Sequence, residues 1–249
     1  MTKMSEKARR YELEGRWFRS SEADAVPTFL IGKKDPSKCR HLFDERQRNR
    51  NTVRDKTPIP HMENILAAAQ AAKHVSTLDM VVAYDQVRVT RDSESKTAFT
   101  TPMGQFCSRV GSMGNLNMPG TFQRCMSKVF AAELGTHVHV YLDNITLTTS
   151  TTVAAHAELY CWVLHRLKHL EMFVGDWDFL PEEVEVLGFV LLNGFRTPCA
   201  RVHNPICNAP QPTSVAEVDR FFGCVQFLRE HMIDGAVECS MMADVVKHR

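Results

Sequence analysis

The chain has 249 residues, a formal net charge of +1 and a hydrophobic content of 44 %, which support one large or two small folded domains and exclude general disorder. No hydrophobic run approaches the ~20 residues of a membrane span, and the charged stretch 1–10 has no hydrophobic run behind it, so we expect neither contact with a membrane nor a secretory signal. The eight cysteines form no Cys-x-x-Cys pair, so we expect reduced thiols in a cytoplasmic or nuclear protein.

Charge is unevenly distributed along the chain. Residues 1–60 contain 15 lysines and arginines against 9 aspartates and glutamates, whereas the remainder contains 15 against 20. A basic first part beside an acidic body fits phosphate binding by the one and metal binding by the other. An ordinary solvated surface explains the same numbers, so charge by itself favours nucleic acid only weakly.

The first sixty residues predict a helix followed by a hairpin. A short charged helix and a loop are expected within residues 5–24. The hydrophobic run Val26–Gly32 and the alternating stretch Arg40–Arg46 predict two strands, followed by a polar loop at 48–52.

A basic tip, Lys33–Lys38, joins the two strands of this hairpin. Its cations have two interpretations. They form a solvated surface, or they belong to a finger whose Lys33 and Arg40 reach triphosphate oxygens, where arginine suits bidentate pairing.

The next elements are a helix and a short strand. Hydrophobic residues at helical spacing predict a helix over Met62–Lys73. The run His74–Asp79 predicts a strand that ends in a carboxylate.

The middle of the chain predicts a hairpin, a loop and a helix. Thr97–Thr101 and Phe106–Val110 flank the turn 102–105, and the small residues of Gly111–Asn117 predict a loop. Pro119 then opens a helix at a position where its missing N–H costs nothing.

A second hairpin carries another carboxylate. Val138–Val140 and Ile145–Leu147 predict strands on either side of Asp143-Asn144, a pair that suits a tight turn. A carboxylate at such a tip is exposed and rigidly held, so it is well placed to bind a divalent cation. One aspartate cannot hold Mg²⁺ in a phosphoryl-transfer site, so Asp79 is the best candidate for the converging second carboxylate.

The last hundred residues predict mixed structure. Ala154–Met172 predicts a long amphipathic helix, and 173–180 a strand or loop. Val184–Leu192 predicts a strand, 198–212 an irregular segment because of its prolines, and the residues from Val215 a further helix.

Three motifs, taken in their order, resemble the palm of a reverse transcriptase, and the closest pattern is that of gypsy-type LTR retrotransposons. They are Leu78-Asp79, Ala83-Tyr84-Asp85-Gln86-Val87 and Tyr141-Leu142-Asp143-Asn144. The resemblance implies an α+β right-hand polymerase fold. It implies a charged helix and loop at 1–24, fingers at 25–73, a palm with some fingers elements at 74–196, and the start of a thumb at 197–249.

The resemblance also implies a set of site residues. Asp79, Asp143 and Asn144 take the catalytic positions, and Asp79, Met80 and Asp143 would bind Mg²⁺ or Mn²⁺. The incoming dNTP would contact Lys33, Arg40, Tyr84, Met113 and Gly114. The primer–template, an RNA/DNA hybrid or a DNA duplex, would contact Arg46, Pro119, Phe122, Gln123, Leu187, Gly188 and Phe189.

The chain departs from the family pattern where chemistry depends on it. The family's second motif ends in two aspartates, whereas this chain has Asn144 in the second place. A lysine regarded as a candidate proton donor falls on Asp176, and an aromatic residue falls on Glu45. The resemblance therefore implies a polymerase impaired by the loss of one carboxylate.

Three functions remain open at this point. The chain is an active or impaired RNA-directed DNA polymerase domain, a catalytically silent relative that binds nucleic acid or a protein, or an element remnant without a selected role. Composition does not separate them.

Overall fold

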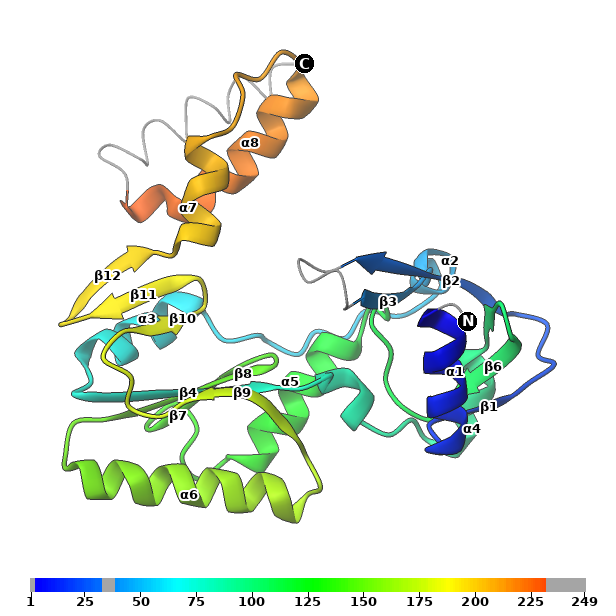
Figure 1. Ribbon diagram of the computed structural model, residues 1–249, viewed down its shortest axis with the longest axis horizontal. Helices are drawn as coiled ribbons and strands as arrows, with labels where there is room; N and C mark the ends of the chain where they lie inside the picture. Colours follow the sequence, from blue (N-terminus) through cyan, green and yellow to red (C-terminus); the bar gives the residue numbers. More distant parts are fainter. Residues whose placement is uncertain (1–2, 33–38, 232–249) are drawn as a thin grey trace.

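The computed structural model describes residues 3–32 and 39–231. Lys33, the rest of the basic tip and the end of the predicted thumb segment lie outside these residues. The described chain contains three β-sheets, of five, four and three strands. The five-stranded sheet lies at one side of the molecule, and the other two lie together at the opposite side (Figure 1). Among the described residues, no helix is both long and hydrophobic enough for a membrane span.

The five-stranded sheet has the order β1-β6-β5-β2-β3. Its strands are β1 (Trp17–Arg19), β2 (Val26–Gly32), β3 (Cys39–Phe43), β5 (Phe99–Thr101) and β6 (Gly104–Ser108). Helix α1 (Lys3–Leu13) covers it through Ala8 and Tyr11, which share a buried cluster with Trp17 and Phe99. The two hairpins predicted in this region are present as the antiparallel pairs β2–β3 and β5–β6.

Two local predictions in this region are wrong. Residues 17–19, expected as loop, form β1, because they pair with the distant β6 and local pattern carries no signal for such a short strand. The expected polar loop at 48–52 begins within helix α2 (Arg46–Arg50). Its residues are polar all round, so no hydrophobic periodicity marked the helix.

The four-stranded sheet has the order β7-β8-β4-β9, and all its pairings are antiparallel. Its strands are β4 (His74–Met80), β7 (Val138–Tyr141), β8 (Asn144–Thr149) and β9 (Val174–Asp178). The predicted strands at 74–79 and on both sides of the 143–144 turn are confirmed. Segment 173–180, predicted to be a strand or a loop, contains strand β9.

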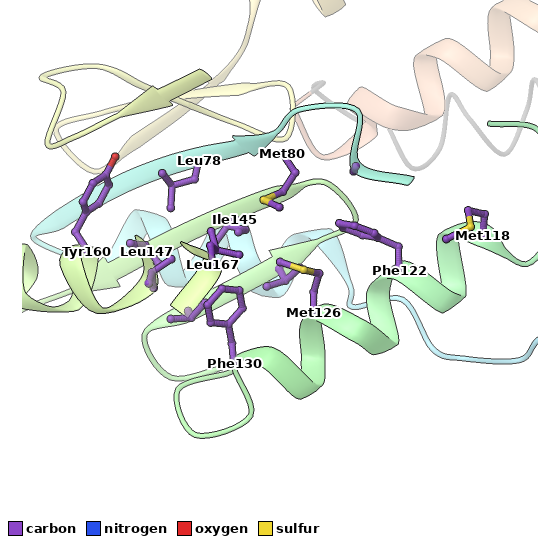
Figure 2. Close-up of a cluster of buried hydrophobic side chains, with 14 residues drawn as sticks. Leu78, Met80, Met118, Phe122, Met126, Phe130, Ile145, Leu147, Tyr160 and Leu167 are labelled. Carbon is purple, nitrogen blue, oxygen red and sulfur yellow. The ribbon is translucent and has the colours of Figure 1, made fainter. Parts of the chain in front are cut away.

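Helices α5 (Met118–Val129) and α6 (Val153–His169) pack on one face of this sheet. Figure 2 shows Phe122 and Met126 of α5, and Phe130 directly after it, directed at the strand residues. Side chains alternate along a strand, so Leu78 and Met80 enter this core while Asp79 lies exposed on the other face. Burial of the apolar face thus fixes which way the carboxylate points.

The three-stranded sheet has the order β10-β11-β12 and packs with helix α3 (Met62–Ala71). Its strands are β10 (Val184–Val186), β11 (Phe189–Leu192) and β12 (Phe195–Pro198). The single strand predicted at 184–192 is two strands, because Leu187 and Gly188 adopt φ of +49° and +91° and turn the chain.

Helices α7 (Ala200–Cys207) and α8 (Val215–Leu228) follow and extend away from the sheets (Figure 1). The irregular segment predicted at 198–212 is wrong for α7, which tolerates Pro205 near its end. Short helical elements complete the described chain: η1 (Ala83–Gln86), α4 (Arg91–Glu94), η2 (Ser95–Thr97) and η3 (Arg229–His231).

Candidate active site

The turn between β7 and β8 holds the first candidate carboxylate. Tyr141 pairs with Asn144, so Leu142 and Asp143 form the two-residue turn, one position earlier than predicted. Leu142 adopts φ of +54°, a conformation that costs a branched residue energy and persists only when its surroundings impose it.

Gln123 of α5 imposes that conformation. The backbone N–H of Leu142 donates to Gln123 Oε1 at 2.9 Å, and Gln123 Nε2 donates to the Val140 carbonyl at 3.1 Å. The glutamine is only 1 % exposed. A buried side chain therefore ties the turn to the helix beneath it and limits where Asp143 can lie.

The second carboxylate, Asp79, lies at the matching end of β4. Asp79 pairs with Asn144 across the β4–β8 ladder, and the N–H of Met80 donates to the Asp143 carbonyl at 2.9 Å. Asn144 Nδ2 donates to Asp143 Oδ1 at 3.3 Å, a bond that an aspartate at 144 could not donate. Backbone pairing therefore places Asp79 and Asp143 at one edge of the sheet, which is the arrangement that the sequence predicts.

A cleft of about 580 Å³ opens in front of these strand ends. Six of the residues singled out from the sequence line it: Arg40, Asp79, Met80, Tyr84, Met113 and Asp143. Asp176 of β9 lines it as well. One wall is therefore acidic, and the opposite wall, from the five-stranded sheet, carries the cation Arg40.

Tyr84 forms part of the floor between these walls. Its ring lies 5.9 Å from that of Phe122, at 72°. Burial raises the pKa of its hydroxyl, and the negative charge of Asp143 adds to that shift. The tyrosine is therefore held in its neutral form next to the acidic wall.

The loop that carries Met113 is clamped against β3. Gly114 adopts φ of +117°, and a Cβ there would meet the Phe43 carbonyl at 2.8 Å, so only glycine fits. Asn49 holds the loop from both sides, since its Nδ2 donates to the Gly114 carbonyl and its Oδ1 accepts from the Leu116 N–H.

A polar cluster lies at the other end of the cleft and consists of the buried Tyr11 and His41 and the partly buried Lys7 and Asp85. Tyr11 donates to Asp85 Oδ2 at 2.6 Å. Burial raises the pKa of Asp85 and lowers that of Lys7. Burial, with the nearby Lys7 charge, lowers the pKa of His41 to about 3. The cluster thus tends to neutral forms.

Comparison with known proteins decides the family. The family described as reverse transcriptase (RNA-dependent DNA polymerase) matches residues 31–191. The chain belongs to the reverse transcriptase family.

Two relatives of this reverse transcriptase chain are polyproteins of transposons. It is 30 % identical to the retrovirus-related Pol polyprotein from transposon 297 of Drosophila melanogaster, over 90 % of this chain and 22 % of the relative. It is 28 % identical to the Tf2-7 polyprotein of Schizosaccharomyces pombe, over 85 % of this chain and 16 % of the relative. The predicted kinship with LTR-retrotransposon reverse transcriptases is confirmed, and the chain spans about a fifth of such polyproteins.

Solved structures show the same fold. A foamy viral protease-reverse transcriptase in complex with double-stranded DNA aligns with a TM-score of 0.86 at 23 % identity, over 96 % of this chain and 42 % of that one. The same viral protein with an RNA/DNA hybrid aligns with a TM-score of 0.77 at 23 % identity, over 92 % and 31 %. The predicted α+β right-hand polymerase fold is confirmed, whereas the boundaries at 24, 73 and 196 stay predictions.

Several residues predicted to contact template or primer are not available on the surface of this reverse transcriptase domain. Phe122 and Phe189 are fully buried, and Gln123 supports the turn. Their side chains serve the core, because the helix and strand that carry the motif turn those positions inward. Gly188 is buried too, whereas Pro119 and Leu187 are partly exposed.

Arg46 differs from Arg40 in its surroundings. Arg46 donates twice to Asp44, at 2.7 and 2.6 Å. Its charge is therefore partly neutralised before any phosphate approaches. Arg40 is exposed and lines the cleft, which leaves it the better placed of the two for a triphosphate.

The site offers oxygen ligands from two carboxylates. Among residues 3–32 and 39–231, no three side chains of His, Cys, Asp or Glu converge as a metal-binding group. The carboxylates of Asp79 and Asp143 are hard oxygen donors of the type that Mg²⁺ prefers, and the strand register brings them together. The donor chemistry therefore fits the divalent metal that the family implies, with two carboxylates rather than three.

Some supporting roles were not predicted, including that of Gln123, which was expected at the template or primer. Gln86, Gln123 and Asn49 each bind one backbone N–H and one backbone carbonyl through a single side-chain amide. Only the partners, which lie far away in sequence, reveal such a role, so no local signal would have identified it.

Proposed function

We propose that this domain binds a primer–template and a dNTP and extends the primer 3′ end by nucleotidyl transfer, at a rate limited by Asn144. The observation that supports this most directly is the composition of the cleft. Asp79 and Asp143 lie on one wall, Arg40 lies on the opposite wall, and Tyr84 lies between them. That distribution matches a substrate whose phosphates are anionic and whose metal-bound end needs carboxylates.

Asp79, Asp143 and the carbonyl of Met80 would hold the divalent cations. When bound, the metal lowers the pKa of the attacking 3′-hydroxyl and neutralises charge on the leaving pyrophosphate. The rigid sheet and the hydrogen bonds from Gln123 to the turn keep the two carboxylates in place before substrate arrives, so little reorganisation is needed.

The nucleotide would lie across the floor of the cleft. Tyr84 supports the sugar, and its ring would exclude a 2′-hydroxyl by contact. Arg40 pairs with the triphosphate, with Met113 and Gly114 beside the base. Lys33 belongs to the same proposal as a second triphosphate cation.

The primer–template would lie along the three-stranded sheet and α5. Leu187 at the β10–β11 turn and Pro119 at the start of α5 are accessible enough to touch it. The two viral structures that share the fold are complexes with double-stranded DNA and with an RNA/DNA hybrid, which supports this path. Arg46 would exchange Asp44 for a backbone phosphate.

Asn144 accounts for the limited rate. It supplies a neutral amide where a carboxylate would add one negative charge beside two dications. Losing that charge costs about 3–5 kcal/mol of transition-state stabilisation, a factor of roughly a thousand.

Primer extension on an RNA template, with a filter-binding assay on the same duplex, tests the proposal. We expect both wild type and Asn144→Asp to bind duplex, and Asn144→Asp to extend about a thousandfold faster. Fast extension by wild type would refute the limit set by Asn144. Binding without extension by either protein would instead identify a binding module.

A further inference from the structure

Strand β9 brings a third carboxylate beside Asp79. It pairs with β4 through Leu78–Trp177 and Met80–Val174, and the register shifts between these pairs. Gly175 and Asp176 are therefore the two residues of β9 that lie opposite Asp79, as in a β-bulge, a device that re-aims side chains.

The backbones approach closely at this point. A Cβ on Gly175 would lie 3.2 Å from the Val81 Cβ and 3.6 Å from the Asp79 carbonyl. Gln86 secures the start of β9, because it accepts from the Phe173 N–H at 2.7 Å and donates to the Phe173 carbonyl at 2.9 Å. Asp176 is thus mounted on a fixed strand rather than on a loop.

Asp176 shares both cavities of this region with Asp79. It lines the main cleft with Asp79 and Asp143, and a second cavity of about 340 Å³ with Asp79 and Asn144. Its side chain is exposed. Asp79 and Asp176 therefore line both cavities, whereas Asp143 lines only the main cleft and Asn144 only the second cavity.

We propose that Asp176 supplies part of the negative charge that Asn144 lacks and acts on the bound divalent cation through a metal-bound water. The inference rests on the proposed function. No three acidic side chains converge directly in the described part of the chain, which excludes inner ligation by all three as they stand. Mg²⁺ keeps several of its waters in proteins, so a carboxylate one water away still accepts a hydrogen bond and attracts the dication.

Mn²⁺ binding to the full chain, without nucleotide, tests this inference. The free Mn²⁺ signal in electron paramagnetic resonance measures the dissociation constant. We expect Asp176→Asn to weaken Mn²⁺ binding about fivefold to tenfold, and Asp92→Asn, an exposed change on α4, to leave it unchanged.

A second change separates charge supply from a structural role. Asn144→Asp, combined with Asp176→Asn, should return the affinity to about that of wild type, since one carboxylate replaces the other. A distorted strand would not be rescued in this way. Equal melting temperatures of the single variants check that both fold.

The outcomes distinguish this inference from the proposed function. Weaker binding in Asp79→Asn but not in Asp176→Asn would refute the role of Asp176 and leave the metal site standing. Unchanged binding in Asp79→Asn would refute the metal site itself, and the inference with it. Tighter binding in Asp176→Asn would also overturn the inference.

Discussion

The two ends of the cleft handle charge in opposite ways. At the end formed by the four-stranded sheet, the carboxylates of Asp79 and Asp176 are exposed above a hydrophobic core. At the other end, Tyr11 and His41 are buried, and Tyr11 is bonded to Asp85. Exposed carboxylates on a rigid sheet can attract a cation, whereas the hydrogen bond between Tyr11 and Asp85 joins α1 to η1. Changes at the first end should therefore alter chemistry, and changes at the second should alter stability.

The largest expected effect concerns Asp143. In the Asn144→Asp background, Asp143→Asn should lower the single-turnover extension rate by about a thousandfold, or ~4 kcal/mol, because it removes a metal ligand. The free energy of unfolding should change by less than about 0.5 kcal/mol, because Asp143 is partly exposed in a turn and packs in no hydrophobic core of the described chain. A loss of stability of about 4 kcal/mol, measured by urea denaturation, would contradict the division between a chemical end and a stabilising end of the cleft. Asp92→Asn serves as the control.

Gln123 connects the two behaviours, since it is a buried group that positions an exposed one. Gln123→Leu leaves the Leu142 N–H and the Val140 carbonyl without their partner. It should lower the free energy of unfolding by about 2–4 kcal/mol and weaken Mn²⁺ binding. Gln70→Leu, which removes one surface bond to the Gly194 carbonyl, should cost less than about 1 kcal/mol. Equal costs would show that burial is not the cause.

Tyr11→Phe isolates the buried end. Loss of its bond to Asp85 should lower the free energy of unfolding by about 1.5–3 kcal/mol, with Mn²⁺ affinity unchanged. Tyr160→Phe is the control, because Tyr160 is a mostly buried tyrosine whose hydroxyl makes no hydrogen bond within residues 3–32 and 39–231. Altered metal binding in Tyr11→Phe would mean that the two ends are coupled.

The smallest effect is a dependence on pH. The pKa of His41 falls from about 6.5 in the unfolded chain to about 3 in the fold, so the unfolded state binds more protons between these values and stability falls as pH falls. His41 should contribute a loss of about 1–2 kcal/mol between pH 7 and pH 5. Burial also lowers the pKa of His139 and His156, which adds to this loss of stability at low pH. Burial raises the pKa of Asp85, which opposes the loss.

Comparing wild type with a His41 variant cancels the contributions of these other groups to the pH dependence of stability. Urea denaturation of wild type and His41→Phe at both pH values measures only the His41 share, because phenylalanine suits the surrounding rings of Trp17, Phe43 and Phe99. Parallel pH curves for the two proteins would show that His41 is not held neutral.

Hydrophobic periodicity predicted the elements that build the site. The strand at 74–79 and the strands around 143–144 follow from β-branched runs, and the helix opened by Pro119 follows from spacing and cap chemistry. Predictions failed where an element had no hydrophobic pattern, as in α2, or where a turn inside an apolar run split it, as at Leu187-Gly188. Backbone conformations with positive φ at residues other than glycine leave no local signature.

By itself the sequence determined the family, the fold and the two carboxylates, because motif order and alternation are properties of local chain chemistry. Only the tertiary structure decided which motif residues face outward and which are buried, as Phe122 and Gln123 are. It also decided that Asp176 stands beside Asp79, since that proximity arises from the pairing of strands nearly a hundred residues apart. Long-range pairing depends on the summed burial of both sheet faces, a quantity that no local stretch of sequence contains.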